Sequence, residues 1–247
     1  MSGAQDSAEK VGDRQLMTLP EQIAERIFFA IEQGSYVPSE RIREELVAEQ
    51  YGVSRGTVRE AMRILERDAV VSILPNRGAH VTQLSTQEVG DIFEIRRNLI
   101  GVMVRRLHQR KDTLPSLIER MSAEVLTLEE LAVEPGAGEA YLAISDRLAR
   151  MLAQGAGNAR LADMLASLAR QTRRYSKLGL ATMARRRASA NTWRKALQAL
   201  QCGDVNSASH AIEELIDASR CEAIRQLQLA AVTSRELDQS HAVSSSS

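Results

Sequence analysis

One short stretch constrains the fold of this chain more than any other, residues 52–67, which read GVSRGTVREAMRILER. Ser54 stands where the N-cap of a helix belongs, because its hydroxyl can accept from the first unpaired backbone N–H groups. Val58, Met62 and Leu65 follow at helical spacing and form one apolar stripe. The stretch therefore predicts the turn and the second helix of a helix-turn-helix.

Another face of the same helix carries arginine. The arginines recur every four residues, which aligns their guanidinium groups, at Arg55, Arg59, Arg63 and Arg67. Gly56 and Thr57 occupy the first turn, the part of a recognition helix that approaches base edges and phosphates. A row of arginines is also common on a solvated helix face, where Glu60 and Glu66 could pair with it. The row alone leaves both interpretations open.

The residues that follow favour the first interpretation. Two short β-prone runs, 70–73 and 79–82, flank the segment LPNRG, whose Pro, Asn and Gly are typical of a tight turn. We expect a β-hairpin here, with Arg77 at its tip. A helix-turn-helix followed directly by a hairpin is a winged helix.

Residues 18–83 resemble, in order, the amino-terminal domain of the GntR-type bacterial transcription regulators. LPEQIAERIFFAIEQGSYVP is similar to its first helix, RIREELVAEQYGVSRGTVREAMRILERDAV to its helix-turn-helix, and NRGAHV to its wing. The run GVSRGTVREA is among the more specific parts of that signature. The chain departs from it at Ser39, where the family usually has glycine, and at Val47, where leucine is common. Neither departure touches the expected DNA face.

The resemblance implies a protein that binds double-stranded DNA. We expect the contacts from the recognition helix and the wing, at Ser54, Arg55, Gly56, Thr57, Arg59, Arg63, Arg77 and Gly78. Helix residues would reach base edges or phosphates, and the wing would enter the adjacent minor groove. Because one half-site is short, we expect a homodimer on an inverted-repeat operator. We further expect the protein to act as a repressor.

The second half of the chain has a different character. Hydrophobic residues make up 44% of the chain and aromatic residues only 3%, a composition that favours helices packed on helices. Ser85 and Glu88 form a capping box that opens a long helix reaching about residue 110. Further helices are expected to start at Pro115 and to cover about 139–155, 158–178, 189–201 and 204–232, with no convincing strand among them.

The predicted fold class is therefore mainly α. It combines an N-terminal winged helix-turn-helix with a small β-hairpin wing, at 18–83, and a C-terminal all-α helical bundle, at 85–232. Residues 1–17 and 233–247 are polar and are expected to be disordered. The bundle resembles the FCD effector domain of the FadR branch of the family, through IFEIRRNL, SDRLARMLAQGAGNARLADML and ALQALQCGDVNSASHAIEELI. This resemblance implies dimerisation and the sensing of a small metabolite.

Members of that branch commonly hold a divalent metal inside the bundle, on an aspartate, a histidine four residues later and two more histidines. This chain keeps the aspartate as Asp146 and has Arg150, Trp193 and Leu215 in place of the histidines. Arginine, tryptophan and leucine do not ligate such a metal. We therefore expect no metal and no other cofactor.

A guanidinium could supply the positive charge that a metal otherwise supplies. Asp146 and Arg150 are one helical turn apart and can pair. Arg150, together with Arg96, could then bind a carboxylate effector, with Trp193 as a flat wall and Leu215 beside it. The alternative is a purely structural Asp146–Arg150 pair with Trp193 filling the space. The residues leave both open.

Other function classes and cell locations are constrained more loosely. We find no nucleophile–base pair, phosphate loop or complete ligand set, so an enzyme such as a metal-dependent helical bundle is a remote alternative. A closer alternative is a regulator whose bundle only dimerises.

The amino terminus is not apolar and no apolar run reaches the ~18 residues of a membrane span, so we expect a cytoplasmic protein. Cys202 and Cys221 are expected to be small core residues.

Overall fold

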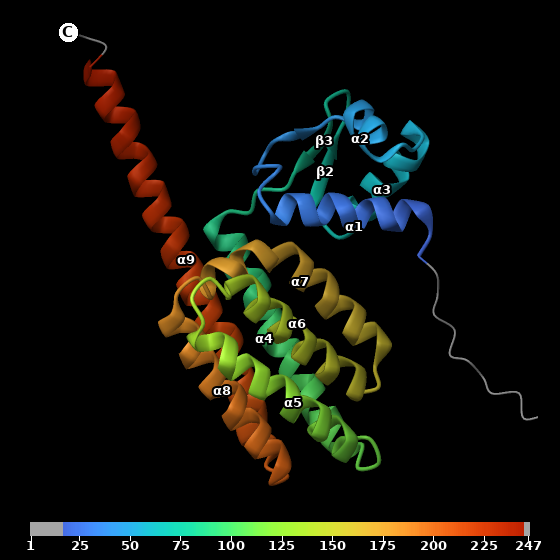
Figure 1. Ribbon diagram of the computed structural model, residues 1–247, viewed down its shortest axis with the longest axis vertical. Coiled ribbons are helices and arrows are strands. Elements are labelled where there is room, and N and C mark those ends of the chain that lie inside the picture. The colour runs from blue at the N-terminus through green and yellow to red at the C-terminus, as the bar shows by residue number, and fades with distance from the viewer. Residues whose placement is uncertain (1–16, 245–247) are drawn as a thin grey trace, which may run out of the picture. The chain divides into compact units, whose positions relative to one another are not determined.

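The computed structural model describes residues 17–244, with side chains up to residue 229. The chain divides into two compact units, Met1–Val81 and Thr82–Ser247 (Figure 1). The disorder expected at 1–16 and 245–247 lies outside the described residues. No helix in the described range is long and apolar enough to cross a membrane.

The first unit is a small α/β fold. Its elements are α1 (Leu19–Glu32), β1 (Arg41–Ile42), α2 (Glu44–Tyr51), α3 (Arg55–Arg67), β2 (Val71–Leu74) and β3 (Gly78–Val81). The predicted stripe of α3 is confirmed, because Val58, Met62 and Leu65 are almost completely buried. They join Ile23 and Ile27 of α1 in one apolar core. The core orients α3 with its arginine face towards solvent.

The sheet of this unit differs from the predicted two-stranded hairpin. It has three antiparallel strands in the order β1-β3-β2, because the two residues of β1, just before α2, pair with β3. Ile42 pairs with Ala79 and is 1% exposed, while Arg41 pairs with His80. A strand of two residues is too short for an alternating pattern to reveal it, so only pairing with the wing defines it.

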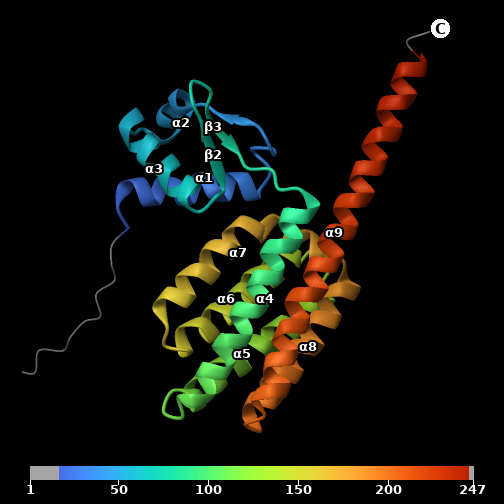
Figure 2. The same cartoon turned by 180° about the vertical axis from the view of Figure 1, so that it is seen from behind.

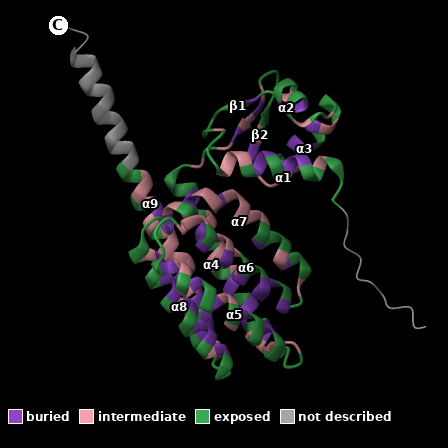
Figure 3. Cartoon of the chain, in the orientation of Figure 1, coloured by how far each residue is buried: buried purple, intermediate pink, exposed green. Residues whose placement is uncertain are grey.

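The second unit is an all-α bundle, as predicted. Its helices are α4 (Thr86–Gln109), α5 (Leu114–Val133), α6 (Gly138–Gly155), α7 (Ala159–Gly179), α8 (Met183–Gln201) and α9 (Val205–Ser244). Helix α4 packs against α9, α7 and α6 (Figure 2). Figure 3 shows the buried residues on the sides of the helices that face one another. The largest core cluster draws on all of α4 to α9.

Helix caps explain most of the boundaries. The capping box of Ser85 and Glu88 is present at the start of α4, and Asn158 caps α7. Helix α8 starts at Met183, earlier than expected, because the hydroxyl of Thr182 caps it. Helix α9 continues past residue 232 to Ser244, through a segment expected to be disordered. No glycine or proline follows Gly203 to stop it.

The two cysteines contradict their predicted place in the core. Cys202 and Cys221 are both exposed. Cys202 is the residue that ends α8, and Cys221 lies on the outer side of α9. The small size and moderate hydrophobicity of cysteine do not predict whether it is buried. Burial depends on whether the residue lies on the helix face that packs against the bundle.

Candidate functional site

The amino end of α3 is built as the sequence predicts. The Ser54 hydroxyl accepts a hydrogen bond from the Thr57 backbone N–H at 3.1 Å, and the two hydroxyls lie 2.9 Å apart. Gly56 between them is exposed. The first turn of α3 therefore presents small side chains and backbone N–H groups, which suits an approaching phosphate.

The arginines of α3 are exposed, and two of them hold glutamates of α2. Arg55 Nη2 lies 2.5 Å from Glu45 Oε1, and Arg59 Nε lies 2.8 Å from Glu44 Oε2. Backbone hydrogen bonding at Glu45, followed by the Arg55 guanidinium, holds the pKa of that carboxyl below its ordinary value. Exposed ion pairs of this kind are weak, so a phosphate or a base can replace the glutamates as partner of the arginines.

Sequence spacing had pointed to Glu60 and Glu66 as possible partners of the arginine row. Instead, Glu66 accepts a hydrogen bond from the Ile73 backbone N–H at 3.2 Å, which ties the end of α3 to β2. The partners come from the preceding helix, because the turn between α2 and α3 brings the start of α2 beside the arginine face.

The wing carries the predicted Arg77 and lies next to a second arginine, Arg41, which the sequence did not predict as a contact. Arg77 is exposed at the tip, between Asn76 and Gly78, which both adopt left-handed backbone conformations with φ of 60° and 81°. A Cβ on Gly78 would lie 3.5 Å from Nε of Arg41, so the Arg41 guanidinium lies against the wing. The sequence gives no signal for this placement, because β1 is too short for an alternating pattern to reveal it.

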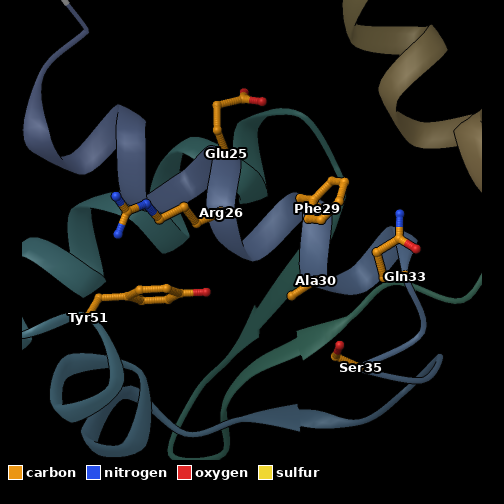
Figure 4. A pocket seen from close by; sticks show the side chains of 7 residues that line it. All are labelled: Glu25, Arg26, Phe29, Ala30, Gln33, Ser35 and Tyr51. Atoms are coloured by element: carbon orange, nitrogen blue, oxygen red, sulfur yellow. The ribbon is translucent and has the colours of Figure 1, made fainter. Parts of the chain in front are cut away.

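A shallow depression on the first unit contains none of the predicted DNA contacts. Its volume is about 530 Å³, and Figure 4 shows its lining, which consists of Glu25, Arg26, Phe29, Ala30, Gln33, Ser35 and Tyr51. The Arg26 guanidinium lies over the Tyr51 ring, 5.5 Å from its centroid. The depression is thus separate from the arginine row and the wing.

In the bundle, the predicted pair of Asp146 and Arg150 is wrong. Asp146 accepts a hydrogen bond from Arg173 of α7, whose other terminal nitrogen lies 3.3 Å from Glu139. Lys177 also contacts Glu139, at 2.7 Å. Arg150 is exposed. The face of α6 that carries Asp146 is turned towards α7, so a residue from a different helix supplies the guanidinium.

Arg96 of α4 has the surroundings expected of a site for an anion. Its Nη1 donates to the Thr172 hydroxyl at 2.7 Å and lies 3.4 Å from the Ser176 hydroxyl, both on α7. Its Nε is enclosed and has no hydrogen-bond partner among the described residues. Burial lowers the pKa of Arg96 to about 10, so the group stays charged at neutral pH. In the described part of the chain, no carboxylate pairs with it.

The remaining residues of the predicted pocket are part of the packed interior. Trp193 is 4% exposed and Leu215 is 9% exposed, and both belong to the main core cluster. The structure therefore does not bring Arg150 together with Trp193 and Leu215 around one opening. Among the predicted pocket residues, Arg96 remains a candidate for binding an anion, because its Nε–H has no acceptor among the described residues.

The residues do not fit the metal of related bundles. Asp146 is engaged by Arg173, Arg150 is exposed, and the other two positions are apolar core residues. Within the described range, no group of three His, Cys, Asp or Glu side chains could hold a metal ion. That the purified protein contains no tightly bound metal remains a prediction, which elemental analysis would test.

A winged helix with exposed arginines, followed along the chain by an all-α bundle, is the architecture of DNA-binding transcription regulators that carry a second, helical domain. Family models agree. The model for bacterial regulatory proteins of the gntR family matches residues 19–81, and the model for the FCD domain matches residues 91–218. The chain belongs to the GntR family and carries an FCD domain. It is a transcription regulator rather than an enzyme.

Individual relatives support the same assignment. The HTH-type transcriptional regulator YdhC of Bacillus subtilis is 41% identical over 63 residues, which are 26% of this chain and 28% of YdhC. The HTH-type transcriptional repressor GlaR of Escherichia coli K12 is 32% identical over 71 residues, 29% of this chain and 32% of GlaR. The chain thus aligns with under a third of the length of these two relatives. The structure of E. coli McbR/YncC shares the fold, with a TM-score of 0.73 and 18% identity over 86% of this chain and 100% of that one.

Proposed function

We propose that this regulator is a homodimeric repressor that binds an inverted-repeat operator. The exposed arginines at the amino end of α3 carry the proposal, together with Arg77 at the tip of the wing and Arg41 of β1, which lies against the wing. Guanidinium groups can donate to guanine bidentately or to phosphates. A single α3 reads only a few base pairs, so two copies related by a two-fold axis are needed for a specific site.

Selection of binding sites from randomised duplex DNA tests this part of the proposal. We expect the enriched sequences to contain two inverted half-sites, with centres about one helical turn, or a multiple of it, apart. Binding should weaken steeply with salt, because each neutralised phosphate releases counterions. Enrichment of a single half-site would contradict the homodimer, and no enrichment at all would contradict sequence-specific recognition.

The second part of the proposal is that the bundle senses a small organic anion at Arg96. A partly buried guanidinium without a carboxylate partner is costly unless another group compensates its charge. Thr172 and Ser176 provide neutral oxygens, and the Phe93 ring lies 5.1 Å from Cζ of Arg96, so no partner carries a full negative charge. A carboxylate on the enclosed Nε and a terminal nitrogen would supply both the charge and the missing acceptor. Coupling between two binding sites is reciprocal. An anion that changes the affinity of the protein for DNA must therefore bind the DNA-bound protein with a different affinity from the free protein.

Replacing Arg96 by methionine is expected to abolish stabilisation by the effector and to leave the protein folded. The probes are short mono- and dicarboxylic acids and acyl thioesters, added to the purified protein in a thermal-shift assay with a chelator present. A ligand at a hundredfold excess over its dissociation constant stabilises the native state by ~2.7 kcal/mol. The shift should vanish in Arg96→Met.

The exposed Arg150 is the matched control for this experiment. Arg150→Met should retain the shift, because its side chain lies outside the bundle. A shift that persists in Arg96→Met and disappears in Arg150→Met would refute the assignment of the anion to Arg96. If no acid shifts the melting temperature of the native protein, the bundle serves dimerisation alone, which is the competing interpretation.

A further inference from the structure

Helix α4 presents an exposed face with a regular repeat. Six of its exposed residues follow one another at alternating spacings of four and three, namely Asp91, Ile95, Asn98, Val102, Arg105 and Gln109. Such spacing keeps side chains on one face of a helix and is typical of helices that pair with another helix. Two of these residues are large and apolar, Ile95 at 47% exposed and Val102 at 38% exposed. We call these six residues the α4 face.

The opposite side of α4 is already occupied. Val89, Phe93, Met103 and Leu107 are buried, and α4 packs against α9 and α7 (Figure 2). Among the described residues of its own unit, no element covers the α4 face. Large apolar residues that are exposed together on one helix face are typical of an interaction surface.

Charge on the exposed side of α4 reverses along the helix. The amino-terminal half carries the acidic residues Glu88, Asp91 and Glu94, and the carboxyl-terminal half carries the basic residues Arg105 and Arg106. The midpoint of the reversal lies near Asn98, which also lies between Ile95 and Val102. A second α4 lying antiparallel would place acid opposite base at both ends, whereas a parallel one would place like charges together.

We propose that the α4 face is the surface through which two copies of this chain associate, with their α4 helices antiparallel about a two-fold axis near Asn98. The inference rests on the proposed homodimer and names its interface. An interface between two identical copies about a two-fold axis must be complementary to itself. The α4 face meets this condition, because Ile95 and Val102 lie on either side of the axis and the charges on its two sides are opposite.

Helix α5 shows why exposed apolar residues alone do not make such a surface. Leu126 and Val133 are 60% and 52% exposed and are seven residues apart, as Ile95 and Val102 are. Exposed Glu119 and Glu130 accompany them, with only Arg120 of opposite sign. An antiparallel copy of α5 would bring glutamate near glutamate. Self-complementarity thus selects α4 over α5.

A charge-reversal experiment tests the proposal. One variant carries Asp91→Arg and Glu94→Arg, and the other carries Arg105→Glu and Arg106→Glu. Glu88 is kept, because it closes the capping box of α4. Each variant alone would face like charges at both ends, and we expect its homodimer to dissociate ~100-fold more readily in size exclusion with light scattering. Mixing the two variants should restore a dimer that contains one copy of each.

The outcomes separate the interface from the homodimer itself. Variants that fold, as judged by circular dichroism, and still form homodimers with unchanged affinity would overturn the α4 assignment while the proposed homodimer stands. Native protein that is monomeric both free and on its operator would overturn both. Val102→Asp should also dissociate the dimer, and Leu126→Asp, which introduces the same change on α5, should not.

A cross-link provides a second measurement that does not depend on charge. In a background with Cys202→Ser and Cys221→Ser, both exposed positions, Asn98→Cys places a thiol next to the proposed axis. Oxidation should link two chains, because a disulfide requires Cα atoms within about 7 Å. Ala123→Cys, at an exposed position of α5, is the matched control and should remain unlinked. Equal cross-linking of the two variants would contradict the proposal.

Discussion

Replacing Arg55 by alanine is expected to weaken operator binding by about 5- to 150-fold, which corresponds to the ~1–3 kcal/mol of one bidentate contact to a base. Arg55 begins α3, where a recognition helix comes nearest to the base edges, and its side chain is exposed. The variant also leaves Glu45 without its ion-pair partner, which adds a repulsive carboxylate near the phosphates. Titration of a fluorescent operator duplex at fixed salt would measure the loss.

Arg67→Ala is the matched control, because Arg67 belongs to the same exposed row but lies at the far end of α3. We expect it to change operator affinity by less than Arg55→Ala does. The role of Arg55 follows from the sequence dependence of the loss. If Arg55 contacts a base, its removal lowers the affinity of the protein for the operator only. If Arg55 contacts a phosphate, its removal lowers the affinity for all DNA sequences and reduces the dependence of affinity on salt by about one unit of slope. Unchanged operator affinity would remove Arg55 from the contacts.

Replacing Gly179 by alanine is expected to destabilise the bundle by about 1–3 kcal/mol, the usual cost of forcing extra volume into a packed interior. A Cβ on Gly179 would lie 2.7 Å from the backbone oxygen of Ser219 and 3.2 Å from its Cα. These are main-chain atoms of α9, so no side-chain rotation relieves the overlap and the two helices must separate. Thermal unfolding should show the loss, at about 2–4 °C for each kcal/mol.

Gly90→Ala is the control for this substitution, since it adds the same methyl group to a helix of the same bundle. Its Cβ would meet only Ile224 Cδ1, at 3.7 Å, which is an ordinary contact. Because alanine favours a helix over glycine by ~1 kcal/mol, Gly90→Ala should leave the melting temperature unchanged or raise it. Equal effects of the two variants would show that α7 and α9 are not as close at Gly179 as the structure has them.

Much of the fold could be predicted because it depends on local signals. The cap at Ser54, the stripe of Val58, Met62 and Leu65, and the capping box at Ser85 act within one or two turns of a helix, and each is present. The winged helix, the hairpin and the all-α bundle follow from such signals in series. The family follows from the same residues, since its model matches residues 19–81, which include α3.

The candidate site in the bundle could be predicted only in part. Arg96 was identified from its position on α4, but the enclosure of its Nε and its hydroxyl partners on α7 came from the structure. The proposed pairing of Asp146 with Arg150 failed, because a one-turn spacing shows only that two side chains can meet. Arg173 reaches Asp146 from α7 and takes that place.

The sequence by itself determined which segments are helical, where they are capped, and that a row of arginines lies on one face of α3. The tertiary structure alone decided which groups from distant segments meet: Glu44 and Glu45 with the arginines, Arg41 with the wing, and α4 with α7 around Arg96. The physical reason is range. Caps and helical stripes act between residues that are neighbours along the chain, whereas ion pairs and buried hydrogen bonds depend on which helix faces pack together.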